Sequence, residues 1–236
     1  MRRREFLRLA VSSILVLVSP VRVLAGRQKA WAMAIDVEKC IANKGCNDCV
    51  EACHETHNVP SMPEKRHEIK WIWLQGIEEV LGAQKREDFK EKEVPVMCNH
   101  CDNPPCVKVC PTKATWRRED GVVMMDYHRC IGCRYCMAAC PYGARSFNFL
   151  DPEPYIKNLN MGFPRRTKGV VEKCNFCEER LAKDLLPICV LACKEKALLF
   201  GDVNDPESEI GRLLRKKMAL SRKGHLGTRP RVFYVF

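Results

Sequence analysis

Apolar stretches along the chain are short and separated by polar turns, a pattern more typical of small strands than of long helices. Strands are predicted where β-branched and aromatic residues cluster or alternate with polar ones. The predicted strands cover residues 33–37, 67–75, 115–118, 122–127, 145–149, 169–171, 197–200 and 231–236. The Asp120-Gly121 pair between two of these stretches predicts a hairpin turn.

A helix is predicted near the C-terminus. Asp205 is its expected N-cap and Pro206 its first residue, because proline suits the first helical position. Its apolar face would consist of Ile210, Leu213, Leu214 and Met218. The apolar tail at 231–236 suits either the protein's own core or a partner surface, and packing in the core is favoured.

Residues 1–25 have the features of an export signal. A basic start precedes an apolar stretch from Leu9 to Val18, and Val23-Leu24-Ala25 is similar to a cleavage site for removal after Ala25. The stretch 3–8, RREFLR, is similar to the twin-arginine signature RRxFLK, which directs export of folded proteins. We therefore expect a periplasmic protein. An ordinary secretory signal or an uncleaved anchor is the alternative, although the apolar run is shorter than the roughly 20 residues of a membrane span.

The sixteen cysteines form four runs of four. The runs are Cys40, Cys46, Cys49 and Cys53; Cys98, Cys101, Cys106 and Cys110; Cys130, Cys133, Cys136 and Cys140; and Cys174, Cys177, Cys189 and Cys193. Cysteines so close in sequence rarely meet disulfide geometry, so metal binding is favoured. Structural zinc would explain separated CxxC pairs but not runs with a further cysteine and a proline.

The third run matches the bacterial ferredoxin pattern, in which three thiolates hold one [4Fe–4S] cluster and the fourth reaches another. Gly132 provides the permissive backbone that such a loop needs. If Cys136 and Cys140 lie on one helical turn, their Cβ atoms are about 6 Å apart. The two thiolates can then bind neighbouring clusters.

The net charge of +11 does not indicate nucleic-acid binding. Residues 1–25 carry five arginines and one glutamate, so their removal leaves +7. Four clusters with a charge of about −2 each would bring the mature protein to roughly −1. The basic residues are also scattered, and no nucleic-acid-binding motif is present.

The adjoining stretches CNHCDNPPCVKVCP (98–111) and CIGCRYCMAACPYGA (130–144), together with the outer runs, resemble the four-cluster ferredoxin subunits of membrane-bound oxidoreductases. Examples are the polysulfide, dimethyl sulfoxide and nitrite reductase complexes. HEIKWIW (67–73), residues 120–144 and KGVVEKCNFC (168–177), with the leader, are similar to the periplasmic iron–sulfur subunit of the Dsr membrane complex of dissimilatory sulfur metabolism, the DsrO type.

The resemblance implies an α+β fold of two nested bacterial-ferredoxin-like units, each with short strands and helices and two [4Fe–4S] clusters. The expected organisation is a signal (1–25), an outer unit (33–95 plus 169–205), an inner unit (96–150), a linker (151–168) and a C-terminal helix and strand (206–236). Residues 54–97 form an insertion between the first two runs.

The resemblance also implies crossed ligation of four clusters. The expected ligand sets are Cys98, Cys101, Cys106 and Cys140; Cys130, Cys133, Cys136 and Cys110; Cys174, Cys177, Cys189 and Cys53; and Cys40, Cys46, Cys49 and Cys193. Five residues separate Cys40 from Cys46, where the family more commonly has two. Three clusters would be expected if the Cys40 run were incomplete.

The expected function is electron relay without a catalytic site. A cluster with four cysteine ligands leaves no iron open to substrate. By resemblance, the partners would be a quinone-reactive membrane subunit, which would provide the membrane contact, and a haem c subunit. The alternatives are the electron-transfer subunit of a molybdopterin oxidoreductase, such as polysulfide or dimethyl sulfoxide reductase, and a zinc-stabilised interaction protein.

Other polar residues near the runs have two possible roles. Arg129, Arg134 and Lys173 either adjust cluster potentials or belong to the solvated surface, and the second role is favoured. The six histidines show no metal-binding spacing, so we expect surface or packing roles for them.

Overall fold

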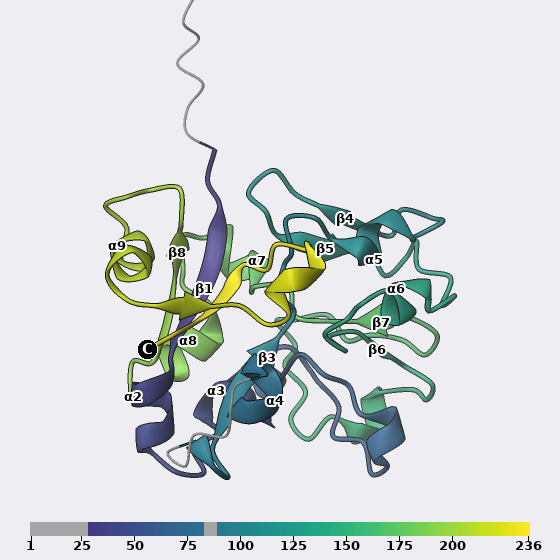
Figure 1. Cartoon of the computed structure of the whole chain (residues 1–236). Coiled ribbons are helices and arrows are strands. Elements are labelled where there is room, and N and C mark those ends of the chain that lie inside the picture. The colour runs from purple at the N-terminus through teal and green to yellow at the C-terminus, as the bar shows by residue number, and fades with distance from the viewer. Residues whose placement is uncertain (1–27, 83–88) are drawn as a thin grey trace, which may run out of the picture.

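The fold is described from a computed structural model, in which residues 28–82 and 89–236 are described. The predicted signal at 1–25 lies outside the described residues. The rest combines short helices with four small sheets, as an α+β fold requires (Figure 1).

The largest sheet joins the two ends of the described chain. Its strand order is β8-β1-β10-β9. The strands are β1 (Trp31–Asp36), β8 (Leu198–Asp202), β9 (Ala219–Leu220) and β10 (Val232–Val235). β1 pairs antiparallel with β8 and parallel with β10, so Met33 lies opposite both Phe200 and Val232. Tyr234 is fully buried, which confirms that the apolar tail packs in the protein's own core.

Three two-stranded antiparallel sheets complete the strands. They pair β2 (Ile72–Gly76) with β3 (Glu93–Met97), β4 (Thr115–Arg117) with β5 (Val123–Met125), and β6 (Ser146–Phe147) with β7 (Val171–Glu172). The β4–β5 pair confirms the predicted hairpin across Asp120 and Gly121. The β6–β7 pair connects the predicted inner and outer units.

The expected strand at 67–75 begins later than predicted. Lys65–His67 forms a short 3-10 helix, η1, and β2 starts only at Ile72. The sequence analysis also missed β3, because Pro95 lies inside it. A proline cannot donate to a strand partner, but a two-stranded sheet has a free edge where this donor is not needed. α4 (Ile77–Leu81) follows β2.

Most of the remaining helices are one or two turns long and either contain a cysteine or directly follow one. They are α2 (Val37–Ala42), α3 (Asp48–Thr56), α5 (Pro105–Lys108), α6 (Tyr135–Ala138), α7 (Glu178–Leu181) and α8 (Ile188–Ala192). α3 packs against α8, and α5 packs against α6. Figure 1 shows α2, α3 and α8 on one side of the molecule and α5 and α6 on the other.

The C-terminal helix begins three residues after the predicted start. α9 (Glu209–Lys216) has Ser208 as its N-cap, and the Ser208 hydroxyl accepts a hydrogen bond from the Gly211 N–H at 3.0 Å. Asp205 instead accepts from the Glu207 N–H at 2.9 Å, in a turn before the helix. Ile210 is buried as predicted, but Met218 lies beyond the helix and is exposed.

The segment 151–168 packs against the body of the protein. It contains the 3-10 helix η3 (Glu153–Tyr155), and Asn160 donates to the Thr56 carbonyl at 2.7 Å. Asn58 donates to the Phe163 carbonyl at 2.6 Å, and Phe163 is buried. A further 3-10 helix, η4 (Gly224–Leu226), lies before β10. Among the described residues, the structure contains no helix of the length and apolarity needed to cross a bilayer.

Candidate metal centres

All sixteen cysteines lie in described residues, and each is a free thiol. They line four separate pockets, with four cysteines at each. We name each group by its first residue. The Cys40 quartet is Cys40, Cys46, Cys49 and Cys193; the Cys53 quartet is Cys53, Cys174, Cys177 and Cys189; the Cys98 quartet is Cys98, Cys101, Cys106 and Cys140; and the Cys110 quartet is Cys110, Cys130, Cys133 and Cys136. These are the groups that crossed ligation requires.

Short helices divide each run between two quartets. Cys49 and Cys53 lie four residues apart on α3 and line different pockets. Cys189 and Cys193 divide in the same way at α8. The second cysteine run divides after Cys106, which lies on α5, and the third run divides after Cys136, which lies on α6. The Cys40 and Cys53 quartets are therefore neighbours, and so are the Cys98 and Cys110 quartets.

The two middle quartets also meet. Cys174 packs against the buried cluster formed by Cys98, Cys101, Tyr142 and Ala144. Burial raises the pKa of the Cys174 thiol to about 12, and proximity to Cys98 is the next largest cause. The four pockets thus follow one another in the order Cys40, Cys53, Cys98, Cys110.

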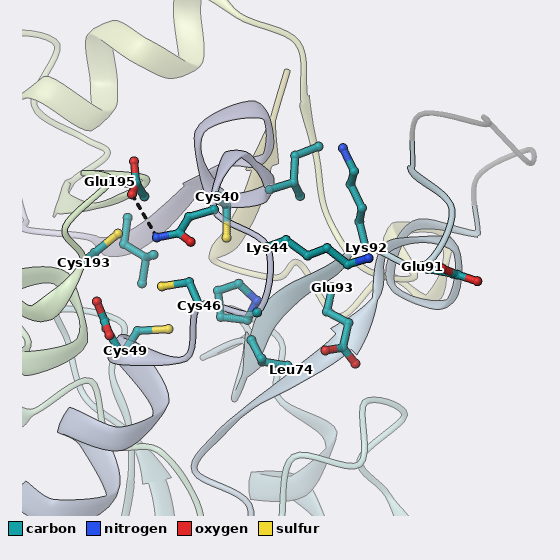
Figure 2. A pocket seen from close by; sticks show the side chains of 16 residues that line it. Cys40, Lys44, Cys46, Cys49, Leu74, Glu91, Lys92, Glu93, Cys193 and Glu195 are labelled. Carbon is teal, nitrogen blue, oxygen red and sulfur yellow. Dashed lines mark hydrogen bonds between the residues drawn. The ribbon is translucent and has the colours of Figure 1, made fainter.

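The Cys40 quartet is complete despite the longer loop between Cys40 and Cys46. α2 presents Cys40, and its N-cap Asp36 accepts from the Lys39 N–H at 3.2 Å. Figure 2 shows the four sulfur atoms of this quartet around one pocket. The Ala197 N–H donates to the Cys193 sulfur at 3.3 Å. The loop length therefore does not remove Cys40 from this pocket.

The Cys53 quartet is the most enclosed. Backbone N–H groups of Phe176 and Ile188 donate to the Cys174 and Cys177 sulfurs, both at 3.4 Å. Cys53 and Cys189 are almost completely buried. Hydrogen bonds to sulfur are among the interactions by which a protein adjusts an iron–sulfur centre.

His57 adds a polar group to the wall of the Cys53 pocket. Possible metal-ligand atoms of His57, Cys177 and Glu179 lie within 4.8 Å of one another. However, one ring nitrogen of His57 is 3.0 Å from a Glu179 oxygen, and the other is 2.9 Å from the Cys53 carbonyl. Since both ring nitrogens have protein partners, this group fits an ordered side-chain pair better than a separate metal site.

The Cys110 quartet lies nearest the surface. Cys133 is exposed, and neighbouring Ile131 is 67% exposed. Gly132 has a φ of +69°, and a Cβ at this position would lie 2.5 Å from the Gly169 carbonyl oxygen. Only glycine fits this loop without displacement, as the ferredoxin-like pattern predicts.

Burial and mutual repulsion favour neutral thiols at the enclosed cysteines of the metal-free protein, whereas at Cys110 hydrogen bonds from Thr115 and Thr112 outweigh burial and lower the pKa. Burial, followed by the thiolates of Cys193 and Cys46 and by Asp36, raises the pKa of Cys40 to about 12. Burial and neighbouring cysteines likewise raise the pKa of Cys101 to about 12. Metal cations would reverse this preference, because ligation requires thiolate and releases the proton. Four soft sulfur donors in each pocket fit an iron–sulfur cluster.

The basic residues near the runs differ in exposure. Arg129 and Arg134 are exposed, and Arg129 pairs with Asp126 at 3.3 Å. Lys173 is buried, contrary to the favoured surface role, and donates to the Cys174 carbonyl at 2.7 Å. The sequence analysis missed Arg145, which is buried and donates to the Cys106 sulfur at 3.1 Å. The feature of the sequence that could have identified Arg145 is a positive charge within a predicted strand.

The histidines split between the two expected settings. His57 and His100 are buried, and His100 stacks on Phe176 with ring centroids 3.7 Å apart. His128 and His225 are exposed. Packing and surface roles therefore account for these four.

Two family matches agree with this geometry. Residues 90–155 match one 4Fe-4S dicluster domain family, and residues 129–198 match a second 4Fe-4S dicluster domain family. The first range covers the second and third cysteine runs, whereas the second range covers the third and fourth runs. Two dicluster domains imply four [4Fe–4S] clusters. These matches therefore favour iron–sulfur clusters over the structural zinc considered as an alternative.

Similar proteins cover most of the sequence. The iron–sulfur subunit 1 of the Hdr-like menaquinol oxidoreductase of Archaeoglobus fulgidus is 45% identical over 88% of this chain and 84% of its own length. The iron–sulfur cluster-binding subunit of the menaquinone reductase of Nitratidesulfovibrio vulgaris is 38% identical over 87% and 88%, respectively. The B component of the polysulfide reductase of Wolinella succinogenes is 37% identical over 88% and 94%. The protein belongs to this family of ferredoxin-type iron–sulfur subunits of oxidoreductase complexes, with two 4Fe-4S dicluster domains.

Proposed function

We propose that this protein relays electrons within a membrane-bound oxidoreductase through four [4Fe–4S] clusters, one held by each quartet. The observation that carries the proposal is the gathering of all sixteen cysteines into four pockets of four. When bound, a [4Fe–4S] cluster accepts and returns one electron at a time. The protein's own contribution is to supply the thiolates, to hold the quartets of each outer pair one helical turn apart, to pack the two pairs against each other and to exclude water.

The exposure of the quartets suits a relay with two accessible ends. In each of the two middle quartets, three of the four cysteines are buried. In each of the two terminal quartets, only one cysteine is buried. Electrons would therefore enter and leave through the Cys40 and Cys110 quartets. The protein has no catalytic site in this proposal, because four thiolates occupy the four iron corners of each cluster.

The relatives support one of the two proposed partners. Two relatives are named as subunits of a menaquinol oxidoreductase and a menaquinone reductase. A quinone-reactive integral membrane subunit is therefore the proposed partner at one end, and it would also provide the membrane contact. At the other end we propose a haem c subunit, as in a Dsr-type complex of sulfur metabolism.

The proposed location is the periplasm. The twin-arginine-like stretch Arg3-Arg4-Glu5-Phe6-Leu7-Arg8 supports export of the folded protein. Clusters would then be inserted in the reducing cytoplasm before the thiols meet an oxidising compartment.

A second candidate is the electron-transfer subunit of a molybdopterin oxidoreductase. The 37% identity to the B component of polysulfide reductase favours it. Purification of the native complex separates the two candidates. A large pterin-containing subunit would support the second, whereas a haem c subunit without pterin would support the first.

The proposal is tested by anaerobic purification, iron and sulfide analysis, and a redox titration monitored by EPR. We expect about sixteen irons and about sixteen sulfides per chain, and four interacting spin systems. Zinc without acid-labile sulfide would contradict the proposal.

A further inference from the structure

Arg145 is a buried cation held against cysteine sulfur. It lies directly before β6 and is 4% exposed. One terminal nitrogen donates to the Cys106 sulfur at 3.1 Å and to the Thr115 hydroxyl at 2.8 Å. The other is 3.7 Å from the Met125 sulfur. The Thr115 hydroxyl donates in turn to the Met124 carbonyl at 2.7 Å, and this bond orients the hydroxyl that accepts from Arg145.

The hydrogen-bond partners of Arg145 include no carboxylate in the part of the chain that the structure describes. A guanidinium keeps its charge in proteins, and a buried charge is costly unless an opposite charge lies nearby. The countercharge that the structure places beside Arg145 is the Cys106 sulfur, 3.1 Å from a terminal nitrogen of the guanidinium, which ligation to a cluster would turn into a thiolate.

Arg145 lies between two pockets. It lines the pocket of the Cys98 quartet, and it also contacts the sulfur of Met125, a residue that lines the pocket of the Cys110 quartet. Its hydrogen bond, however, is to Cys106. The Cys98 quartet therefore receives the stronger effect of this charge.

The pocket at the far end of the row has no buried cation among the described residues that line it. The pocket of the Cys40 quartet is lined by four acids and two lysines, namely Asp48, Glu91, Glu93, Glu195, Lys44 and Lys92. Neither of these lysines is buried. Asp48 is paired with Lys194 at 3.0 Å, and the buried Asp36 beside this quartet is paired with Lys217 at 3.1 Å. Because no described residue that lines this pocket is a buried cation, an added electron lacks there the stabilising charge that it has beside Arg145.

We propose that Arg145 makes the cluster of the Cys98 quartet the most easily reduced of the four, so that the first electron in the relay rests there. This inference depends on the proposed function. In the step, the cluster of the Cys98 quartet gains one electron and a reduced neighbouring cluster loses one. No bond forms or breaks, and no proton moves. Charge alone distinguishes the two states, because the buried guanidinium stabilises the more negative reduced form.

The test compares three holoproteins by EPR-monitored redox titration: the unaltered protein, Arg145→Gln and Arg145→Lys. Signals are first assigned with Cys101→Ser, Cys133→Ser and Cys46→Ser, which alter the Cys98, Cys110 and Cys40 quartets. In the unaltered protein, the first signal to appear on reduction should be the one that Cys101→Ser changes. Arg145→Gln should lower the reduction equilibrium constant of this cluster at least tenfold, which is about 59 mV for one electron.

The charge-retaining and surface variants separate electrostatics from packing. Arg145→Lys should keep the reduction potential close to that of the unaltered protein, because lysine retains the positive charge. A small difference should remain, because lysine cannot make the forked hydrogen bonds of arginine. Arg145→Gln should shift the Cys110 quartet less and leave the Cys40 quartet unchanged. The control is Arg129→Gln, since Arg129 is exposed and already paired with Asp126; it should shift no cluster by more than about twofold in the equilibrium constant.

Two results would overturn the inference: a different cluster reduced first in the unaltered protein, or an unchanged potential in Arg145→Gln. If Arg145→Gln does not retain its iron, the order of reduction in the unaltered protein and in Arg145→Lys decides the question. Iron and sulfide counts keep this test separate from the proposed function. Four clusters with a different order of potentials would refute the role of Arg145 and leave the relay intact.

Discussion

Cys136 and Cys140 lie four residues apart around α6, yet Cys136 lines the pocket of the Cys110 quartet and Cys140 lines that of the Cys98 quartet. The α6 segment therefore supplies cysteines to two pockets rather than to one. The corresponding pair on α3, Cys49 and Cys53, has the same relationship.

Single substitutions at Cys136 and Cys140 should consequently damage different clusters. Serine retains an oxygen ligand but lacks the soft sulfur that iron–sulfur clusters require. Cys136→Ser should alter one EPR signal, and Cys140→Ser should alter another. A change in the same single signal by both variants would show that ligation is not crossed.

Gly132→Ala should disturb the Cys110 quartet in particular. The residue has a φ of +69°, and the added Cβ would lie 2.5 Å from the Gly169 carbonyl oxygen. The left-handed conformation alone costs an alanine about 1–2 kcal/mol, and the backbone contact adds to this cost. We expect faster bleaching of visible absorbance in denaturant and a perturbed signal from the Cys110 quartet.

The matched control is Gly143→Ala. Gly143 has a φ of +63°, but a Cβ there would have no heavy atom within 4 Å. It therefore measures the conformational cost without the steric one. Equal effects of the two variants would mean that the close approach of Gly169 is unimportant.

The sequence alone predicted the parts of this molecule that depend on local spacing. The alternation of apolar residues located β1, β8 and β10, and the Asp120-Gly121 turn located the β4–β5 hairpin. The spacing of Cys130, Cys133 and Cys136 indicated cluster binding because three thiolates must reach one small centre.

Features that depend on distant contacts were harder to predict. β3 was missed because Pro95 is unfavourable in most strands, and only the pairing with β2 shows that its donor is not needed. Arg145 could not be placed, because its partners Cys106 and Thr115 lie 39 and 30 residues away in sequence. The same holds for His57 and Glu179, which lie 122 residues apart in sequence.

The N-cap of α9 gives a stability prediction that leaves the metal centres untouched. Ser208→Ala removes the acceptor of the Gly211 N–H and should cost about 1 kcal/mol of unfolding free energy. Asp205→Ala should cost less, because the Asp205 carboxylate lies in the turn before the helix. Chemical denaturation would measure both, and EPR signals should be unchanged. A larger effect of Asp205→Ala would restore Asp205 as the cap.

The Cys40 quartet should hold a cluster of its own despite its longer loop. Cys40→Ser should either reduce the iron content from about sixteen to about twelve atoms per chain or alter a single spin system. The signals of the Cys98 and Cys110 quartets should remain unchanged, because these lie at the other side of the row. Asn43→Ala is a suitable control, since Asn43 lines the pocket and its side-chain amide donates to Glu195 at 3.3 Å rather than to a cysteine sulfur. An iron content of about twelve in the unaltered protein would show that this quartet is empty.

The proposed export route depends on two adjacent arginines in the leader. Twin-arginine recognition requires the pair, whereas an ordinary secretory signal requires only positive charge before its apolar stretch. Changing Arg3 and Arg4 together to lysine preserves the charge and should therefore leave the protein in the cytoplasm. Arg2→Lys, which changes a basic residue outside the expected pair, should be exported normally. Cell fractionation with detection of the iron-loaded protein distinguishes these outcomes. Because lysine retains everything that an ordinary signal needs, normal export of the double variant would identify an ordinary secretory leader and would leave cluster insertion before export without support.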